Sequence, residues 1–97
     1  MRRLLLVGAL ALSGYANAAP WEYATYLTLG SIAQAWSTPA GSVSGKDIDA
    51  ILDALKCPQR GVTGLLNCVG ADGWELVQVV TGDGGSTTNY IFKRPKP

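Results

Sequence analysis

The chain of 97 residues contains no histidine. Histidine-based catalytic triads and proton shuttles are therefore excluded, because both need an imidazole that changes protonation near neutral pH. The chain has two cysteines, and two thiols without histidine are a poor ligand set for zinc. No serine lies in the pattern of a nucleophile elbow. We therefore expect a protein that is not an enzyme and that has no cofactor, no metal site and no catalytic residues.

Charge is also scarce, since charged residues make up 15% of the chain. When the N-terminal leader described below is removed, Arg2 and Arg3 leave with it, and six basic residues remain against seven acidic ones, a net charge of −1. Binding to nucleic acid needs a basic face, and binding to an anionic membrane surface needs clustered lysine or arginine. We expect neither kind of partner.

Long apolar runs are limited to one, Leu4 to Leu12, which follows the basic pair. The run has the length of a signal-peptide core, and Ala16-Asn17-Ala18 carries small residues where a signal peptidase cuts. The alternative is a membrane anchor, but crossing a bilayer takes about 20 apolar residues. We expect a signal peptide over residues 1–18, cleavage after Ala18, and one periplasmic or secreted domain over residues 19–97 with no membrane span.

The two cysteines, Cys57 and Cys68, both lie in the expected mature chain. An even number of cysteines in an oxidising compartment is typical of a disulfide. The alternative is thiol exchange, but redox-active pairs are usually spaced more closely, as Cys-x-x-Cys. We therefore predict a structural disulfide between them.

Residues 21–29 alternate in a pattern typical of a strand, and we place Trp21 and Tyr23 on its core side. Residues 31–45 are rich in glycine, proline and serine, so we predict a flexible loop. Trp36 lies in this segment. It either folds over the edge of the core or is an exposed aromatic side chain for binding.

Two helices are expected next. Ile48, Ile51, Leu52 and Leu55 form one apolar stripe in residues 46–56, with Ser44 as the predicted N-cap. Residues 64–69 form a shorter helix that begins after Thr63 and ends at a left-handed Gly70.

Residues 74–81 and 87–94 are predicted to form a hairpin around a glycine-rich loop. If Trp74, Leu76 and Tyr90 point inward, then Val77, Val79 and Ile91 lie on the opposite, open face. Glu75 is expected to pair with Lys93 or Arg94. We expect a loose tail over residues 95–97.

These elements predict an α+β fold of the order β-α-α-β-β. The sheet is expected to have three strands in the order 1-3-2, antiparallel or mixed, as a split βαβ unit with helices on one face. The predicted core consists of apolar and aromatic residues, namely Trp21, Tyr23, Ile51, Leu52, Leu55, Leu66, Trp74, Leu76, Tyr90 and Phe92.

Four segments of the chain resemble a family of small bacterial and phage proteins that is known only as domain of unknown function 4177. The segments are Trp21–Tyr23, Leu65–Asn67, Gly70–Val77 with its Gly-Trp-Glu-Leu-Val core, and Tyr90–Arg94. The resemblance implies a small α+β fold and brings no known activity, cofactor or catalytic residue. The chain departs from the family pattern in its leader, in the insertion over residues 57–64 and in a longer loop after the first strand.

The sequence therefore favours an exported interaction or structural module. Its open sheet face or its edge strand is expected to bind an unknown protein partner or a second copy of the chain. The alternative is a binder of a small ligand or peptide that uses Trp36 and the loop of residues 31–45 in which it lies. A thiol-redox or hydrolytic enzyme is the hypothesis that the composition supports least.

Overall fold

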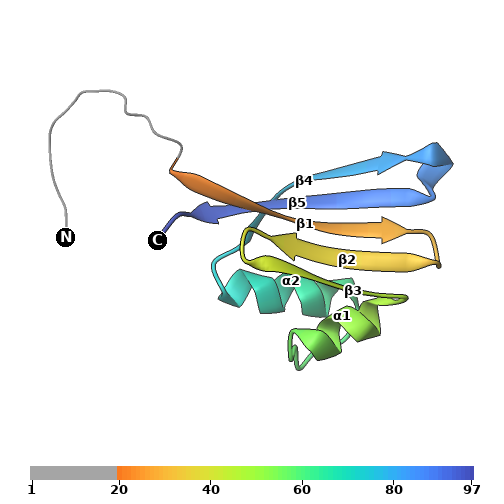
Figure 1. Ribbon diagram of the computed structural model, residues 1–97, viewed down its shortest axis with the longest axis horizontal. Helices are drawn as coiled ribbons and strands as arrows, with labels where there is room; N and C mark the ends of the chain where they lie inside the picture. The colour runs from red at the N-terminus through yellow and green to blue at the C-terminus, as the bar shows by residue number, and fades with distance from the viewer. Residues whose placement is uncertain (1–19) are drawn as a thin grey trace, which may run out of the picture.

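The computed structural model describes residues 20–97, which form an α+β fold with one antiparallel sheet and two helices (Figure 1). The expected signal peptide and its cut after Ala18 lie outside the described residues. In chain order the elements are β1 (Trp21–Leu29), β2 (Ala33–Thr38), β3 (Gly41–Gly45), α1 (Ile48–Ala54), α2 (Gly61–Ala71), β4 (Glu75–Gly82), the 3-10 turn η2 (Asp83–Gly85) and β5 (Thr87–Pro95).

The sheet has five strands in the order β3-β2-β1-β5-β4, so the predicted three-stranded sheet is wrong. The additional strands come from residues 31–45, which form a hairpin and not a flexible loop. Only Pro39 and Ala40 separate β2 from β3, and the Thr38 hydroxyl accepts a hydrogen bond from the Ala40 N–H at 3.1 Å. Residues typical of a loop therefore make one tight turn between two short strands.

The position of β5 between β1 and β4 organises the rest of the sheet. Its pairing with β1 runs without interruption from Trp21 opposite Pro95 to Leu29 opposite Thr87. The Lys96 N–H also donates to the Pro20 carbonyl at 2.8 Å. The prediction that the tail is loose from Pro95 is therefore wrong, because Pro95 belongs to the strand.

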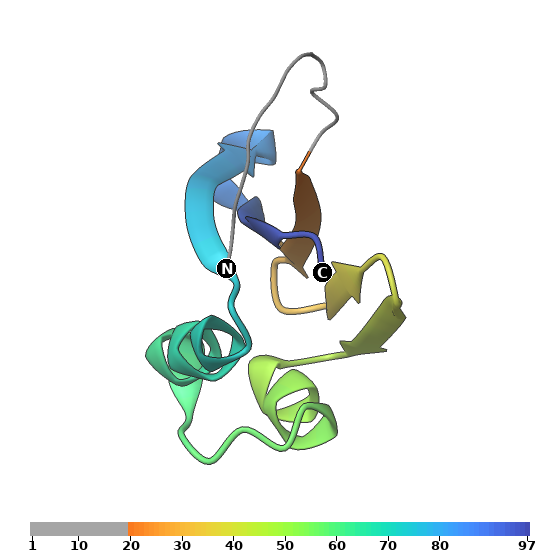
Figure 2. The same ribbon diagram turned by 90° about the vertical axis from the view of Figure 1, so that its left-hand side faces the viewer.

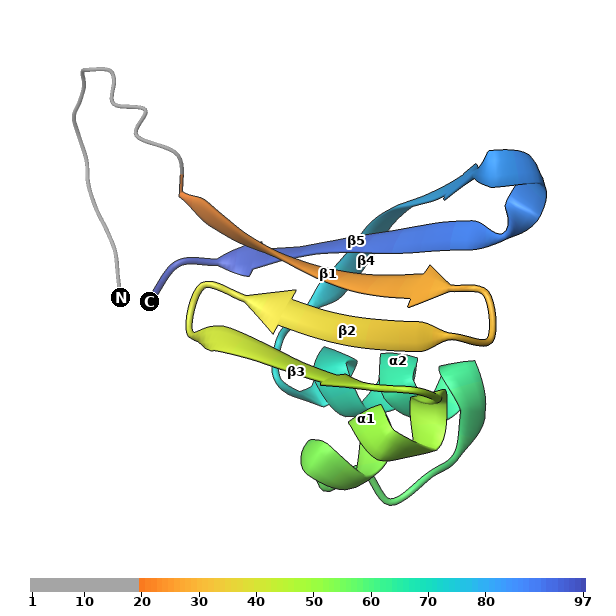
Figure 3. The ribbon, with the colours of Figure 1, turned by 45° about the vertical axis from the view of Figure 1, so that its right-hand side comes forward.

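Both helices lie on the same side of the sheet (Figures 1 and 3), where α1 packs against β2 and β3, and α2 packs against α1 and β4. α1 begins after Asp47, whose carboxylate accepts from the Ala50 N–H at 3.0 Å, so Asp47 is the N-cap and Ser44 belongs to β3. α2 is longer than predicted at both ends. Gly70 lies inside it, and Gly73, with φ of 94°, is the left-handed residue that leads into β4.

The core is built from one face of β1, β2 and β5 packed on the helices. Its buried residues are Ala24, Tyr26, Trp36, Ile51, Leu52, Cys57, Leu65, Val69, Trp74 and Phe92. Leu55, Leu66 and Tyr90 are partly buried against this cluster. Burial of Ile51, Leu52, Trp74 and Phe92 confirms their predicted place in the core.

Three predicted core residues lie elsewhere. The inward face of β1 carries Ala24 and Tyr26, so the prediction for Trp21 and Tyr23 is wrong: Tyr23 is 54% exposed, and half-buried Trp21 packs its ring under the Lys93 ammonium at 4.1 Å. Leu76 is 40% exposed because it lies on the edge strand β4. The alternation in β1 was correct, but aromatic residues occur on both faces of that strand, so aromaticity did not identify the inner face.

Two glycines of α2 make a matched test of this packing. A methyl group at Gly64 would lie 2.4 Å from the Gln59 carbonyl oxygen, whereas one at Gly70 would meet no atom within 4 Å. We expect Gly64→Ala to lower the free energy of unfolding by about 1–3 kcal/mol through overpacking. Gly70→Ala should raise it by about 0.5–1 kcal/mol, because alanine is the better helix former. Urea denaturation of both variants checks the prediction, which fails if the two shifts have the same sign.

Candidate functional site

The exposed edge strand β4 is the most unusual surface of the molecule. All eight of its residues are exposed, and four of them are large apolar residues: Leu76, Val77, Val79 and Val80. In the part of the chain that the structure describes, β4 forms sheet hydrogen bonds with β5 alone. Its outer edge therefore presents unpaired backbone N–H and C=O groups beside apolar side chains, which is a template for another strand.

Figure 2 shows β4 at the outside of the sheet, away from the hairpin of β2 and β3. Between Glu75 and Asp83 the strand carries no charged residue. The lysine, proline and inward charges that protect most free edges are therefore missing from this segment. Three valines and one threonine give the strand high β-propensity, so it is also suited to pairing.

One irregularity does interrupt the edge. The pairing with β5 shifts between Leu76, opposite Phe92, and Gln78, opposite Ile91, which leaves Val77 in a bulge. Beyond the bulge Val79 lies opposite Tyr90 and Val80 opposite Asn89. Val79 therefore shares the face of Tyr90, and its predicted position on the open face with Ile91 is wrong. Bulges cannot be inferred from alternation, because they add one residue to it.

The opposite edge of the sheet offers a much weaker template. β3 has five residues, with glycine at both ends and serine at positions 42 and 44. α1 packs against this strand (Figure 3). The two edges thus differ in length, in apolar content and in cover, and only β4 combines a long strand with exposed apolar side chains.

Trp36, the residue considered for binding from the sequence, lies in the core with 5% exposure. Its ring makes edge-to-face contacts with Phe92 at 5.3 Å and with Trp74 at 6.0 Å between centroids. Trp36 is therefore not an exposed binding aromatic, and the first of the two alternatives for it is correct. It still forms the floor of a shallow hollow of about 290 Å³, which Thr38, Val43 and Leu55 help to line.

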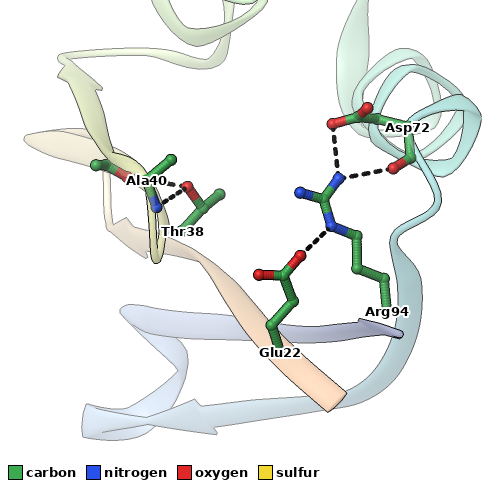
Figure 4. A network of polar contacts seen from close by, with 6 residues as sticks. Glu22, Thr38, Ala40, Asp72 and Arg94 are labelled. Atoms are coloured by element: carbon green, nitrogen blue, oxygen red, sulfur yellow. Dashed lines mark hydrogen bonds and ion pairs between the residues drawn. The ribbon is translucent and has the colours of Figure 1, made fainter. Parts of the chain in front are cut away.

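A polar cluster around Arg94 positions the start of β4. The Arg94 guanidinium donates to Glu22 at 2.6 Å, and to the carboxylate and the carbonyl of Asp72 at 3.0 and 2.8 Å (Figure 4). It also lies over the Trp74 ring at 4.2 Å. Hydrogen bonding to Glu22 raises the pKa of Arg94 further above its ordinary value. The cluster joins β1, β5 and the end of α2, so it orients the chain where it enters β4.

Glu75, the first residue of β4, lies opposite Lys93 in the register, as one of the two predicted pairings requires. No ion pair joins Glu75 to Lys93 or Arg94 among residues 20–97. The partner of Glu22 and Asp72 is Arg94, which the sequence pattern did not reveal because Glu22 and Arg94 are 72 positions apart.

Tyr26 brings a titratable hydroxyl group into the core. Its O–H donates to the side-chain oxygen of Gln34, and its ring lies 5.4 Å from that of Tyr90. Burial, with a smaller contribution from the nearby Tyr90, raises the pKa of Tyr26 to about 12.

This shift predicts a loss of stability in alkali. A raised pKa means that the fold favours the neutral phenol, so the contribution is complete below the unfolded value of about 10 and is lost as pH rises toward 12. We expect Tyr26→Phe to make unfolding less sensitive to pH in this window. The matched control is Tyr23→Phe on the exposed side of β1, which should keep the wild-type sensitivity. Thermal unfolding between pH 9 and 12 provides the measurement, and equal slopes for all three proteins would contradict the assignment.

Cys57 and Cys68 form a disulfide, as predicted, with Cα atoms 5.6 Å apart. Cys57 follows α1 and Cys68 lies in α2, so the bond fixes the two helices against each other. Cys57 is buried in the core, and Cys68 is partly buried against it. A disulfide-bonded pair fits a fold that exists outside the cytoplasm.

Within the described residues, no group of three or more potential ligands could hold a metal ion. No helix in the same range is long and apolar enough to cross a membrane. Comparisons with protein-family models, with curated proteins and with solved structures found no match.

Sequence patterns predicted an interaction surface on the open face or the edge strand of the sheet but did not assign it to β4. Its alternation and its Gly-Trp-Glu-Leu-Val start indicated a strand, and the apolar residues on it were divided between the core and an open face. One cue was available: between Leu76 and Val80 the only polar residue is Gln78, so this run has no polar face. Such a run without a polar face is typical of a strand that is covered on both sides.

Proposed function

We propose that this protein is an exported, non-enzymatic interaction module that binds an extended segment of a protein partner along the outer edge of β4. The observation that carries the proposal is the exposure of all eight β4 residues, with four large apolar side chains and no charge between Glu75 and Asp83. When a partner strand pairs with such an edge, backbone hydrogen bonds provide the affinity and alternate side chains provide the specificity.

The rest of the fold is suited to presenting this edge. Arg94, on β5, forms ion pairs with Glu22 on β1 and with Asp72 just before β4. The disulfide holds α2, the helix that precedes β4. A rigid frame lowers the entropy cost of ordering the strand when a partner binds. The leader pattern of residues 1–18 and the disulfide support a periplasmic or secreted location. Membership in the family of domain of unknown function 4177 stays a prediction based on the resembling segments.

The test is capture from a cell-envelope fraction by the tagged wild-type protein and by Val80→Lys. A charged side chain at position 80 disturbs strand pairing at the edge. The fold should tolerate the lysine, because Val80 is already 44% exposed. Val62→Lys is the matched control, because Val62 is 40% exposed in α2, far from β4 in the chain. We expect the wild type and Val62→Lys to capture an envelope protein that Val80→Lys does not capture. Equal retention by all three baits would contradict binding along β4.

A second candidate function rests on the hollow beside Trp36. Its apolar floor and lining suit a small apolar molecule or one apolar side chain of a peptide. A ligand there would contact the Trp36 ring and change its fluorescence. Apolar probe molecules that bind with the same affinity to the wild type and to Val43→Glu would remove this candidate.

A further inference from the structure

We propose that the strand that occupies the β4 edge belongs to a second copy of this chain, paired antiparallel about a two-fold axis at Val80. This inference rests on the proposed function, because it names the partner of the same edge. The result would be one continuous ten-stranded sheet, twice the five strands of one copy.

The bulge in β4 selects the register. A regular ladder cannot continue through the shift between Leu76 and Gln78, so the uninterrupted part of the strand is Gln78–Gly82. The centre of this segment is Val80. Pairing about Val80 places Gln78 opposite Gly82 of the second copy and Val79 opposite its Thr81, and Val80 meets its own equivalent.

Charge is compatible with the pairing of two copies along this segment. Like charges directly opposite each other destabilise a strand pair. No residue of Gln78–Gly82 is charged, so an antiparallel pair of these segments brings no like charges together.

Closure favours a second copy in this arrangement. Pairing of β4 with β3 of another copy would leave a free edge at each end and grow without limit. β3 is short, rich in glycine and serine, and packed against α1, so it is the poorer partner. Pairing of β4 with β4 uses the same apolar edge twice and covers both exposed apolar strands in a closed dimer. A single strand pair is a small interface, so we expect dissociation constants of about 1–100 μM.

The test uses sedimentation of the full mature chain with paired charge variants. Val80→Lys and Val80→Glu each place like charges opposite each other at the axis, so each variant alone should dimerise at least tenfold more weakly than the wild type. An equal mixture of the two places lysine opposite glutamate and should recover the dimer. The control pair Val62→Lys and Val62→Glu should dimerise like the wild type, alone and mixed. Thermal unfolding checks that all variants are folded.

Each outcome is decisive. Loss in the single variants and recovery in the mixture support pairing about Val80. A wild type that stays monomeric at the highest concentration overturns the inference, as does a dimer that Val80→Lys and Val80→Glu leave unchanged. If the wild type is monomeric but an envelope protein is still retained through β4, the second copy is excluded and the proposed function stands. If neither association occurs, both proposals fail.

Discussion

Trp74→Ala should lower the free energy of unfolding by about 3–5 kcal/mol, the range for removing a large aromatic side chain from a core. Trp74 is 5% exposed and touches Trp36 edge to face. The Arg94 guanidinium also lies over the Trp74 ring in a cation–π contact. The substitution therefore leaves a cavity and removes a contact of the cluster that orients the entry to β4. For a small domain, a loss of this size is a large part of the total stability.

Urea denaturation followed by far-ultraviolet circular dichroism gives the measurement. Trp74→Phe is the conservative control and should lose less, because it keeps an aromatic ring in the same space. A second control, Trp21→Ala, removes a half-buried tryptophan on the open face and should also cost less than Trp74→Ala. If Trp21→Ala proves the more damaging of the two, the assignment of the core face of β1 is wrong.

Removal of the disulfide in Cys57→Ala/Cys68→Ala should cost about 3 kcal/mol, because the bond closes a short loop and restricts the unfolded chain. The two residues are 11 positions apart and connect the end of α1 to α2. Cys57 is also buried in the core, so loss of its sulfur adds a small packing defect.

The double variant is compared with the wild type in the presence and absence of reductant. We expect reductant to destabilise the wild type by a similar amount and to leave the double variant unchanged. Intact mass of the unreduced wild type should be two hydrogens lower than that of the reduced protein. Reductant-insensitive stability of the wild type would contradict a stabilising role for the bond.

Local sequence patterns predicted most of the secondary structure. The apolar stripe from Ile48 to Leu55 identified α1, and the alternation after Trp74 identified the hairpin of β4 and β5. The disulfide was predicted from the cysteine count and the expected oxidising compartment. These features depend on near neighbours in the sequence, so a single sequence contains the information that they need.

Features that depend on long-range contacts were missed. The segment around Trp36 looked like a loop because its strands are short and its turn contains proline and glycine, yet Trp36 pairs with Tyr26 on β1 and stacks on the core. The hydrophobic contacts of Trp36 outweigh the weak strand propensity of its neighbours. The Arg94 cluster and the bulge at Val77 were equally hidden, since both arise only when β5 lies beside its neighbours.

The free edge of β4 is the central claim, and amide hydrogen exchange measured at low and high protein concentration tests it most directly. In dilute solution the β4 amides that point away from β5 should exchange rapidly, while those of β5 stay protected on both sides. At high concentration the outward amides of Gln78–Gly82 should become protected, and the same amides in Val80→Lys should not. Strong protection of these amides at every concentration, or none at any concentration, would contradict a free edge that pairs with a second copy.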